Sequence, residues 1–221
     1  MIIIDICGTL FRSNTTFDFL HWKYKRKKTY QLYYKLYHLK IWKIANKLIY
    51  IIFRIDLTRV IAIRFLKGEK RRDLINDADV FFDEFLRPIT NDKVFSKIEA
   101  LRKSIVGGKL IIISATLDVI AESVARHTGF QLVKSTELEY VDGICSGRIK
   151  EDLLGKKLKF LNGNEPFSAC FTDDISDLPL LINSQANYII VYPRTKSRWD
   201  RVIKENNIEA EIIYISQNFY S

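Results

Sequence analysis

The chain has 221 residues, of which 48% are hydrophobic and 13% aromatic; this composition predicts a globular protein with a full core and excludes a disordered chain. Its three cysteines, Cys7, Cys145 and Cys170, are far apart and odd in number, which excludes a disulfide scaffold and favours a reducing compartment. No apolar run approaches the ~18 residues of a membrane-spanning helix, and residues 1–5 lack the basic start of a signal peptide. We therefore expect a cytoplasmic protein, with attachment to a membrane surface left open.

The net charge of +9 is unevenly distributed along the chain. Residues 21–72 contain 16 lysines and arginines against two acids, whereas the rest of the chain contains 19 bases and 24 acids. The sequence therefore describes a mildly acidic body that carries one strongly basic insert. Such an asymmetry bears on partners and association, and not on the fold.

Short apolar runs, most of them rich in β-branched residues, alternate with amphipathic stretches in the acidic body. Strands are expected at residues 2–5, 110–114, 169–173 and 188–192. Helices are expected at residues 92–104 and 117–128, with Asn91 and Thr116 as their N-caps and Gly107 and Gly129 after their ends. Strands that alternate with helices of this length predict a Rossmann-like α/β core, in which a parallel sheet is covered on both faces.

Two further segments depart from this alternation. Residues 136–149 alternate around Asp142-Gly143, a sequence typical of a β-hairpin. Residues 15–90 have long helical periodicity and interrupt the alternation. We therefore expect an α/β core made of residues 1–14 and 91–221, with a helical, basic cap made of residues 15–90.

Three expected strands end in polar residues, namely Asp5, Ser114 and Asp173. In parallel sheets the reactive site lies at the carboxyl ends of the strands. The first strand leads into Asp-Ile-Cys-Gly-Thr-Leu, where Gly8 permits a tight turn that directs backbone amides at a phosphate. Gly8 and Thr9 are therefore candidate phosphate-binding residues, although Asp5 alone would also suit an ordinary turn.

Acidic residues gather in Phe-Thr-Asp-Asp-Ile-Ser-Asp at residues 171–177. Carboxylates this close repel one another unless they share a cation, and hard oxygen ligands suit Mg²⁺. The alternative is a helix start, where acids favour the dipole. Residues 111–116, Ile-Ile-Ile-Ser-Ala-Thr, offer a hydroxyl group and a helix N-terminus to an anion. The alternative is that Ser and Thr here serve only as helix caps. Gly-Lys-Lys at residues 155–157 opens a helix, where a lysine is usually a solvated surface charge.

Taken together and in this order, these four segments resemble the haloacid dehalogenase superfamily, in the branch that includes phosphoserine phosphatase. Residues 135–149 also look like the hairpin that precedes the lysine motif in that branch. The match covers residues 1–14 and roughly 92–195. The insert matches only by its position, as a helical cap between the first and second motifs.

The resemblance implies a Mg²⁺-dependent phosphatase that acts on a phosphomonoester through an aspartyl-phosphate. Asp5 would be the nucleophile, which splits one hard transfer into two easier ones. Ser114 and Lys157 would hold the phosphate oxygens, with Lys156 as the alternative lysine because the spacing differs slightly from that of the family.

The resemblance also implies a set of metal ligands. The carboxylates of Asp5 and Asp173 and the backbone carbonyl of Cys7 would bind Mg²⁺, and Asp177 would bind the ion or orient its ligands. Mg²⁺ and lysine would then neutralise charge during an in-line transfer.

Cys7 departs from the family's pattern, in which this position holds a second aspartate that protonates the leaving group and activates water. A thiol with a pKa of ~8.5 cannot easily replace that group, which is typically worth about 10²- to 10⁴-fold in rate. Three readings stay open: a slow phosphatase in which Asp174 supplies a substitute carboxylate, a phosphotransferase, and a binding module with little turnover.

The basic insert begins with Lys-Arg-Lys-Lys at residues 25–28 and continues with tyrosines and lysines. One reading is a cap whose aromatic face packs on the body while its lysines face water. The alternatives are attraction of an anionic substrate, or contact with an anionic membrane and a phosphorylated lipid or lipid-linked sugar as substrate. Nucleic acid ranks last, because no nucleic-acid-binding motif is present.

The remaining polar candidates are isolated. His21, His38 and His127 are too scattered for a zinc site and are expected to be structural or exposed. Arg12 and Arg148 are candidates to reach a substrate anion from beside the site.

Overall fold

The computed structural model describes residues 1–53, 55–104, 109–160 and 167–216. Within them the strands form one seven-stranded sheet in the order β4-β3-β2-β1-β5-β6-β7, in which every neighbouring pair is parallel except β3 and β4. The strands are β1 (Ile2–Ile4), β2 (Leu110–Leu117), β3 (Leu132–Val141), β4 (Ile144–Glu151), β5 (Ala169–Thr172), β6 (Asn187–Val191) and β7 (Glu211–Tyr214). The predicted α/β core with a parallel sheet is confirmed.

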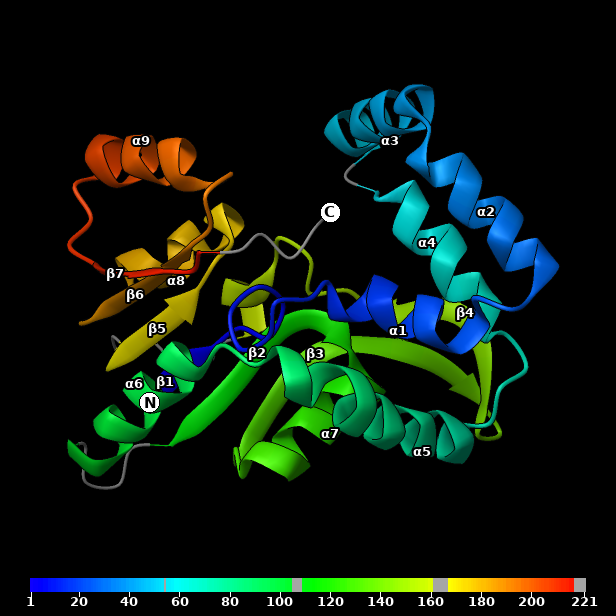
Figure 1. Cartoon of the computed structure of the whole chain (residues 1–221), viewed down its shortest axis with the longest axis horizontal. Coiled ribbons are helices and arrows are strands. Elements are labelled where there is room, and N and C mark those ends of the chain that lie inside the picture. The colour runs from blue at the N-terminus through cyan, green and yellow to red at the C-terminus, as the bar shows by residue number, and fades with distance from the viewer. Residues whose placement is uncertain (54, 105–108, 161–166, 217–221) are drawn as a thin grey trace.

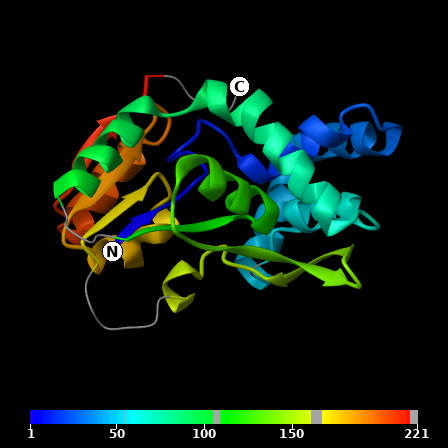
Figure 2. The ribbon, with the colours of Figure 1, turned by 90° about the horizontal axis from the view of Figure 1, so that it is seen from below.

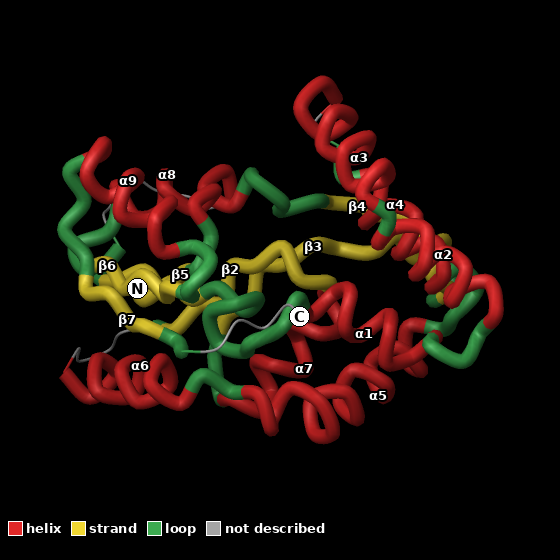
Figure 3. The backbone as a smooth tube through the Cα atoms, turned by 45° about the horizontal axis from the view of Figure 1, so that its top comes forward, coloured by secondary structure: helices red, strands yellow, loops and turns green. Residues whose placement is uncertain are grey.

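Helices cover both faces of the sheet, which gives the core three layers (Figure 3). One face is covered by α6 (Asp92–Ser104) and α7 (Asp118–Thr128), and the other by α8 (Leu178–Ile182) and α9 (Lys196–Asn206). Successive side chains of a strand point to opposite faces. Ile2 and Ile4 of β1 accordingly pack in the core on the α6 and α7 side, whereas Ile3 packs in a second core with Leu180 and Trp199.

The segment between β1 and α6 is helical, as its periodicity predicts (Figure 1). We call residues 15–90 the insertion; its main helices are α1 (Thr15–Tyr24), α2 (Lys28–His38), α3 (Lys40–Phe53), α4 (Leu57–Ile63) and α5 (Arg71–Phe81). Short helical turns follow at Arg64–Leu66, Phe82–Leu86 and Arg87–Ile89. Buried rings of Tyr30 and Tyr33 pack against Phe65 in the interior of the insertion. None of the described helices combines the length and the apolar character needed to cross a bilayer.

The β3–β4 hairpin extends from the sheet along the insertion (Figure 2). Its turn residues Asp142 and Gly143 have φ values of 50° and 76°, which the Asp-Gly pair tolerates. The outer strand also pairs with the insertion, because Gly68 N donates to Cys145 O and Cys145 N donates to Glu69 O, each at 2.8 Å. These bonds fix the insertion on the edge of the sheet.

All four expected strands and both expected helices are present, but the expected cap at Thr116 is wrong. Thr116 belongs to β2, and Leu117 is the N-cap residue of α7. Asn91 directly precedes α6, as expected, and its carbonyl accepts hydrogen bonds from Val94 N and Phe95 N, while its buried side chain donates to Thr9 O at 2.7 Å. Gly129 has the expected left-handed conformation after α7, with φ 71°, and Gly107 lies outside the described residues. The edge strand β7 was not expected, since its residues are mostly exposed and show no clear alternation.

Candidate active site

Three strands bring polar side chains together at the carboxyl edge of the sheet. β1 lies between β2 and β5, with Ile4 opposite both Ile112 and Phe171. Two residues farther along each neighbour, Ser114 and Asp173 therefore lie beside Asp5. All three line a cavity of about 290 Å³.

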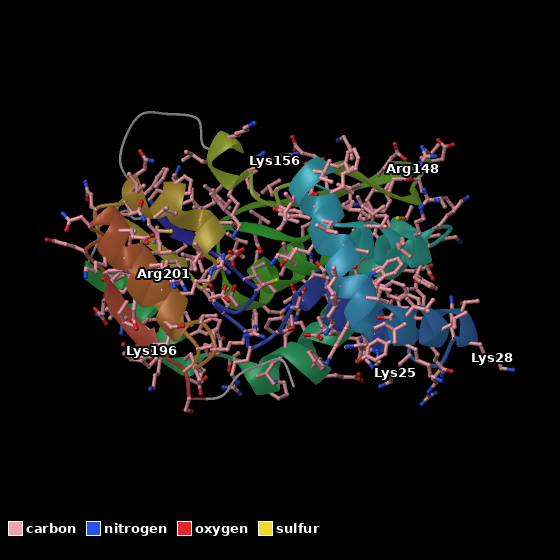
Figure 4. The ribbon with its side chains drawn as sticks, turned by 90° about the horizontal axis from the view of Figure 1, so that it is seen from above. Lys25, Lys28, Arg148, Lys156, Lys196 and Arg201 are labelled. Atoms are coloured by element: carbon pink, nitrogen blue, oxygen red, sulfur yellow. The ribbon has the colours of Figure 1, made fainter. Side chains whose placement is uncertain are left out.

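Lys157 reaches into this cavity from the short helical turn Lys157–Phe160. Its Nζ lies 2.9 Å from Asp5 Oδ1 and 2.7 Å from Asp177 Oδ2, and all three side chains are almost completely buried. Burial alone would lower the pKa of the ammonium group, but the charges of Asp177 and Asp5 hold that pKa well above its usual value. Lys156 is exposed and lies on the outer surface (Figure 4). Lys157 is thus the lysine that the fold brings to Asp5.

Asp177 lies behind this lysine and does not line the cavity. Its Oδ2 accepts hydrogen bonds from Lys157 Nζ and, at 2.6 Å, from Thr172 Oγ1. Burial raises the pKa of the Asp177 carboxyl to about 6, and the charge of Lys157 opposes that increase. Asp177 Oδ2 is thus engaged by Lys157 and Thr172, which places this carboxylate where it orients Lys157.

Gly8 permits the close approach of the loop after β1 to Asp173. Its φ is +68°, and a Cβ atom built there would lie 2.0 Å from Asp173 Oδ2. The Gly8 and Thr9 amides, for which we predict a phosphate-binding role, donate in this conformation to Ser13 O and Ile6 O, each at 3.2 Å. Neither residue lines the cavity. The glycine is required for packing against a carboxylate.

Asp5 and Asp173 are the side chains that best suit a divalent cation. Burial, and next the charge of Asp5, hold the pKa of Asp173 well above its usual value, so a cation that bound both carboxylates would relieve this repulsion. Asp5 Oδ1 is buried, and Lys157 Nζ, at 2.9 Å, is its charged neighbour. Among the described residues, no three His, Cys, Asp or Glu side chains are already arranged to hold a metal ion by themselves. The residues therefore fit Mg²⁺ with two carboxylates, a backbone carbonyl such as that of Cys7, and water as ligands.

The Cys7 thiol belongs to a cluster of hydroxyl groups. Its Sγ lies 3.0 Å from Thr15 Oγ1 and 3.2 Å from Thr116 Oγ1, and these two oxygens are 2.7 Å apart. Thr116 Oγ1 is also 3.0 Å from Ser114 Oγ. Burial, and next the charge of Asp5, raise the pKa of the Cys7 thiol to about 11, so the thiol is neutral at pH 7. We did not expect Thr15 or Thr116 at the site; the second hydroxyl of the Ser-Ala-Thr segment was the available signal.

Arginines that the sequence did not single out also line the cavity. Arg59 of α4 is buried, and its guanidinium donates to Asp152 Oδ1 and to Ala115 O, each at 2.6 Å, so it ties the insertion to β2. Arg194 and Arg198 come from the β6–α9 region. Arg12 and Arg148, the arginines predicted to reach a substrate anion, do not line the cavity. Arg12 donates to Thr90 O at 3.4 Å, and Arg148 lies on the exposed hairpin (Figure 4).

A second cavity, of about 750 Å³, adjoins the first. Residues that line both are Asn14, Phe17, Asp56, Leu154 and Arg194. Its other walls come largely from α2 and α3, which contribute Tyr34, Tyr37, His38, Lys43, Asn46, Lys47 and Tyr50. The polar site at the strand ends thus continues into a larger space walled by aromatic and basic residues of the insertion.

The geometry can be compared with known proteins. Residues 2–181 match the model of the haloacid dehalogenase-like hydrolase family. The chain belongs to this family. The resemblance inferred from the four motifs, and with it the expectation of an enzyme, is confirmed. No curated protein matches the sequence at a significant level.

Solved structures share this fold at low sequence identity. A protein of unknown function from Bordetella pertussis Tohama I has a TM-score of 0.68 and 17% identity, over 95% of this chain and 96% of that one. Cytosolic 5′-nucleotidase IIIB bound to cytidine has a TM-score of 0.63 and 14% identity, over 99% and 80%. A phosphoserine phosphatase in its apo form has a TM-score of 0.56 and 12% identity, over 98% and 93%.

Proposed function

We propose that the chain is a Mg²⁺-dependent phosphatase that acts on a phosphomonoester through an aspartyl-phosphate at Asp5. The observation that carries this proposal is the buried ion pair of Asp5 and Lys157 in a cavity that Ser114 and Asp173 also line. A carboxylate held beside a fixed ammonium group can attack a phosphorus atom whose oxygens that ammonium group neutralises. Phosphatase and nucleotidase folds among the similar structures support the same class of reaction.

Each residue has a defined task in this mechanism. Asp5 attacks phosphorus while Lys157, oriented by Asp177, and Ser114 bind the phosphoryl oxygens. Mg²⁺, when bound by Asp5, Asp173 and a backbone carbonyl, supplies further positive charge to the transferred group. The bond between phosphorus and the ester oxygen then breaks with its electron pair on that oxygen, which takes a proton from solvent water and leaves as the substrate alcohol.

Hydrolysis of the aspartyl-phosphate is expected to be the slow step. The neutral Cys7 thiol is directed at Thr15 and Thr116, so it cannot remove a proton from water at pH 7. Asp174 lines the cavity as a substitute carboxylate, although its Oδ1 accepts a hydrogen bond from Ser176 N at 2.9 Å. A long-lived aspartyl-phosphate favours phosphotransfer to an alcohol as the second candidate function.

The insertion is proposed to act as a cap over a core of residues 1–14 and 91–221. The partner is then a phosphorylated small molecule, and the excess of basic residues in the insertion extends the range to a phosphorylated lipid or lipid-linked sugar at an anionic membrane. Nucleic acid is not proposed. A reducing, cytoplasmic setting agrees with the three unpaired cysteines.

The test is Mg²⁺-dependent phosphate release from an aryl phosphate and a panel of phosphomonoesters. We expect slow release by the wild type, none by Asp5→Asn, and faster release by Cys7→Asp, by about 10²- to 10⁴-fold, the usual worth of a general acid-base. Glycerol added as acceptor would yield glycerol phosphate if transfer competes with hydrolysis. If neither the wild type nor Cys7→Asp releases phosphate from any substrate of the panel while both proteins are folded, the enzymatic proposal is contradicted.

A further inference from the structure

An exposed apolar face runs along α3. Ile41, Ile44, Leu48, Ile51 and Ile52 recur at spacings of three and four residues, so they share one side of the helix. All five are exposed, with Ile44 62% accessible. No residue of α3 is buried. A row of large apolar side chains in water is unfavourable and indicates a surface that something else covers.

The orientation of α3 is fixed by its other side. Trp42 Nε1 donates to Thr58 Oγ1 at 2.8 Å, and Asn46 Nδ2 donates to Asp56 Oδ1 at 3.1 Å. These bonds hold the helix against α4 and leave the apolar face outward. In Figures 1 and 3, α3 lies at the outer end of the insertion, away from the sheet. The exposed face is therefore built into the fold.

The charges around this face match an anionic surface. Lys40, Lys43 and Lys47 lie on the same helix, all exposed, and residues 21–72 contain 16 basic residues against two acids. Two copies of so basic a segment would repel each other, which disfavours pairing of α3 with itself. Negatively charged lipid headgroups would attract the same lysines, while the acyl chains would cover the isoleucines and leucine.

We propose that α3 docks the protein on an anionic bilayer, with its apolar face among the outermost acyl methylenes and its lysines at the headgroups. The same helix also lines the larger cavity through Lys43, Lys47 and Tyr50. A lipid headgroup at this helix would therefore stand at the entrance to the space that continues to Asp5. Resting on the proposed phosphatase function, this docking makes a membrane-borne phosphomonoester, such as a lipid phosphate, the substrate class.

The test of docking is flotation with vesicles of phosphatidylcholine, with and without phosphatidylglycerol, in the absence of Mg²⁺ and substrate. We compare the wild type with Ile44→Glu and with Ile182→Glu, whose wild-type isoleucine on α8 is also 62% exposed. The wild type and Ile182→Glu should float with the anionic vesicles, and Ile44→Glu should partition about tenfold less, because one apolar contact is lost and one charge is added. Equal unfolding midpoints of the two variants would confirm that both are folded.

Three outcomes would overturn the docking. The wild type could fail to float, Ile44→Glu could float as well as Ile182→Glu, or light scattering could show a dimer that Ile44→Glu dissociates while no vesicle binding occurs. Catalysis is then measured separately on phosphatidic acid in vesicles and on a water-soluble aryl phosphate. If the protein cleaves the aryl phosphate without binding vesicles, the docking fails and the phosphatase function stands. If it binds vesicles without cleaving either phosphate, the docking stands and the phosphatase function fails.

Discussion

Replacing Lys157 by methionine removes the positive charge that Asp5 and Asp177 share while keeping a side chain of similar length. The Nζ atom lies 2.9 Å and 2.7 Å from the two carboxylates, and all three side chains are at most 6% exposed. Loss of one partner from a buried ion pair typically costs about 3 to 5 kcal/mol, because the remaining charge is left unpaired. With a urea m-value of roughly 2.5 kcal/mol per M, we expect the unfolding midpoint to fall by about 1 to 2 M.

The measurement is urea unfolding at pH 7 with a chelator present, and the matched control is Lys156→Met. Lys156 is adjacent in sequence but exposed, so its replacement should change the free energy of unfolding by no more than about 0.5 kcal/mol. A loss in Lys157→Met as small as that in Lys156→Met would refute the buried ion pairs and the choice of Lys157 as the phosphate-binding lysine.

The loss should also depend on pH. Without Lys157 the positive charge that opposes the effect of burial is lost, and burial already raises the pKa of Asp177 to about 6 and that of Asp173 well above its usual value. A carboxyl whose pKa is higher in the folded state than in the unfolded state destabilises the fold at high pH, and this penalty is relieved as the pH falls. The difference between Lys157→Met and the wild type should therefore shrink between pH 7 and pH 5.

Three further predictions concern the site and the sheet. Gly8→Ala should lower the free energy of unfolding clearly more than Gly129→Ala. Both variants meet a backbone strain of about 1 to 2 kcal/mol at positive φ, but a Cβ at Gly129 has no atom within 4 Å, whereas one at Gly8 would collide with Asp173. Equal losses of stability on thermal unfolding would contradict the contact with Asp173. Mg²⁺ should raise the melting temperature of the wild type but not of Asp173→Asn, as followed by calorimetry, because only the folded wild type would bind the ion. Burial raises the pKa of Asp118 to about 6, so its charge destabilises the fold above that pH; Asp118→Asn should stabilise the protein at pH 8 by roughly 1 to 3 kcal/mol, and by much less at pH 4.

Much of the fold and part of the site followed from local patterns in the sequence. Ile2–Ile4 is a β-branched apolar run and Ala169–Thr172 a short, largely apolar one, both typical of buried strands, and a parallel sheet brings the carboxyl ends of its strands to one edge. Asp5, Ser114 and Asp173 could therefore be predicted as neighbours without knowledge of any contact. Asp142-Gly143 similarly specified its hairpin, because few other residue pairs accept positive φ at two successive positions.

Only the tertiary structure decided which groups touch. Thr15 and Thr116 are 101 residues apart, and nothing local in either segment predicts that their hydroxyl groups meet at the Cys7 thiol. The partners of the Gly8 and Thr9 amides were likewise not predictable, because they depend on how the loop packs against Asp173 and folds onto its own carbonyl groups.

For the insertion, too, the sequence determined some features and the tertiary structure determined others. Its helices and its net charge could be predicted from the sequence, since periodicity and composition are local properties. The sequence did not predict which face of α3 packs and which stays in water, because both faces carry large apolar or aromatic side chains. The bonds from Trp42 and Asn46 to the start of α4 made that choice, and they left Ile44 and its neighbours exposed.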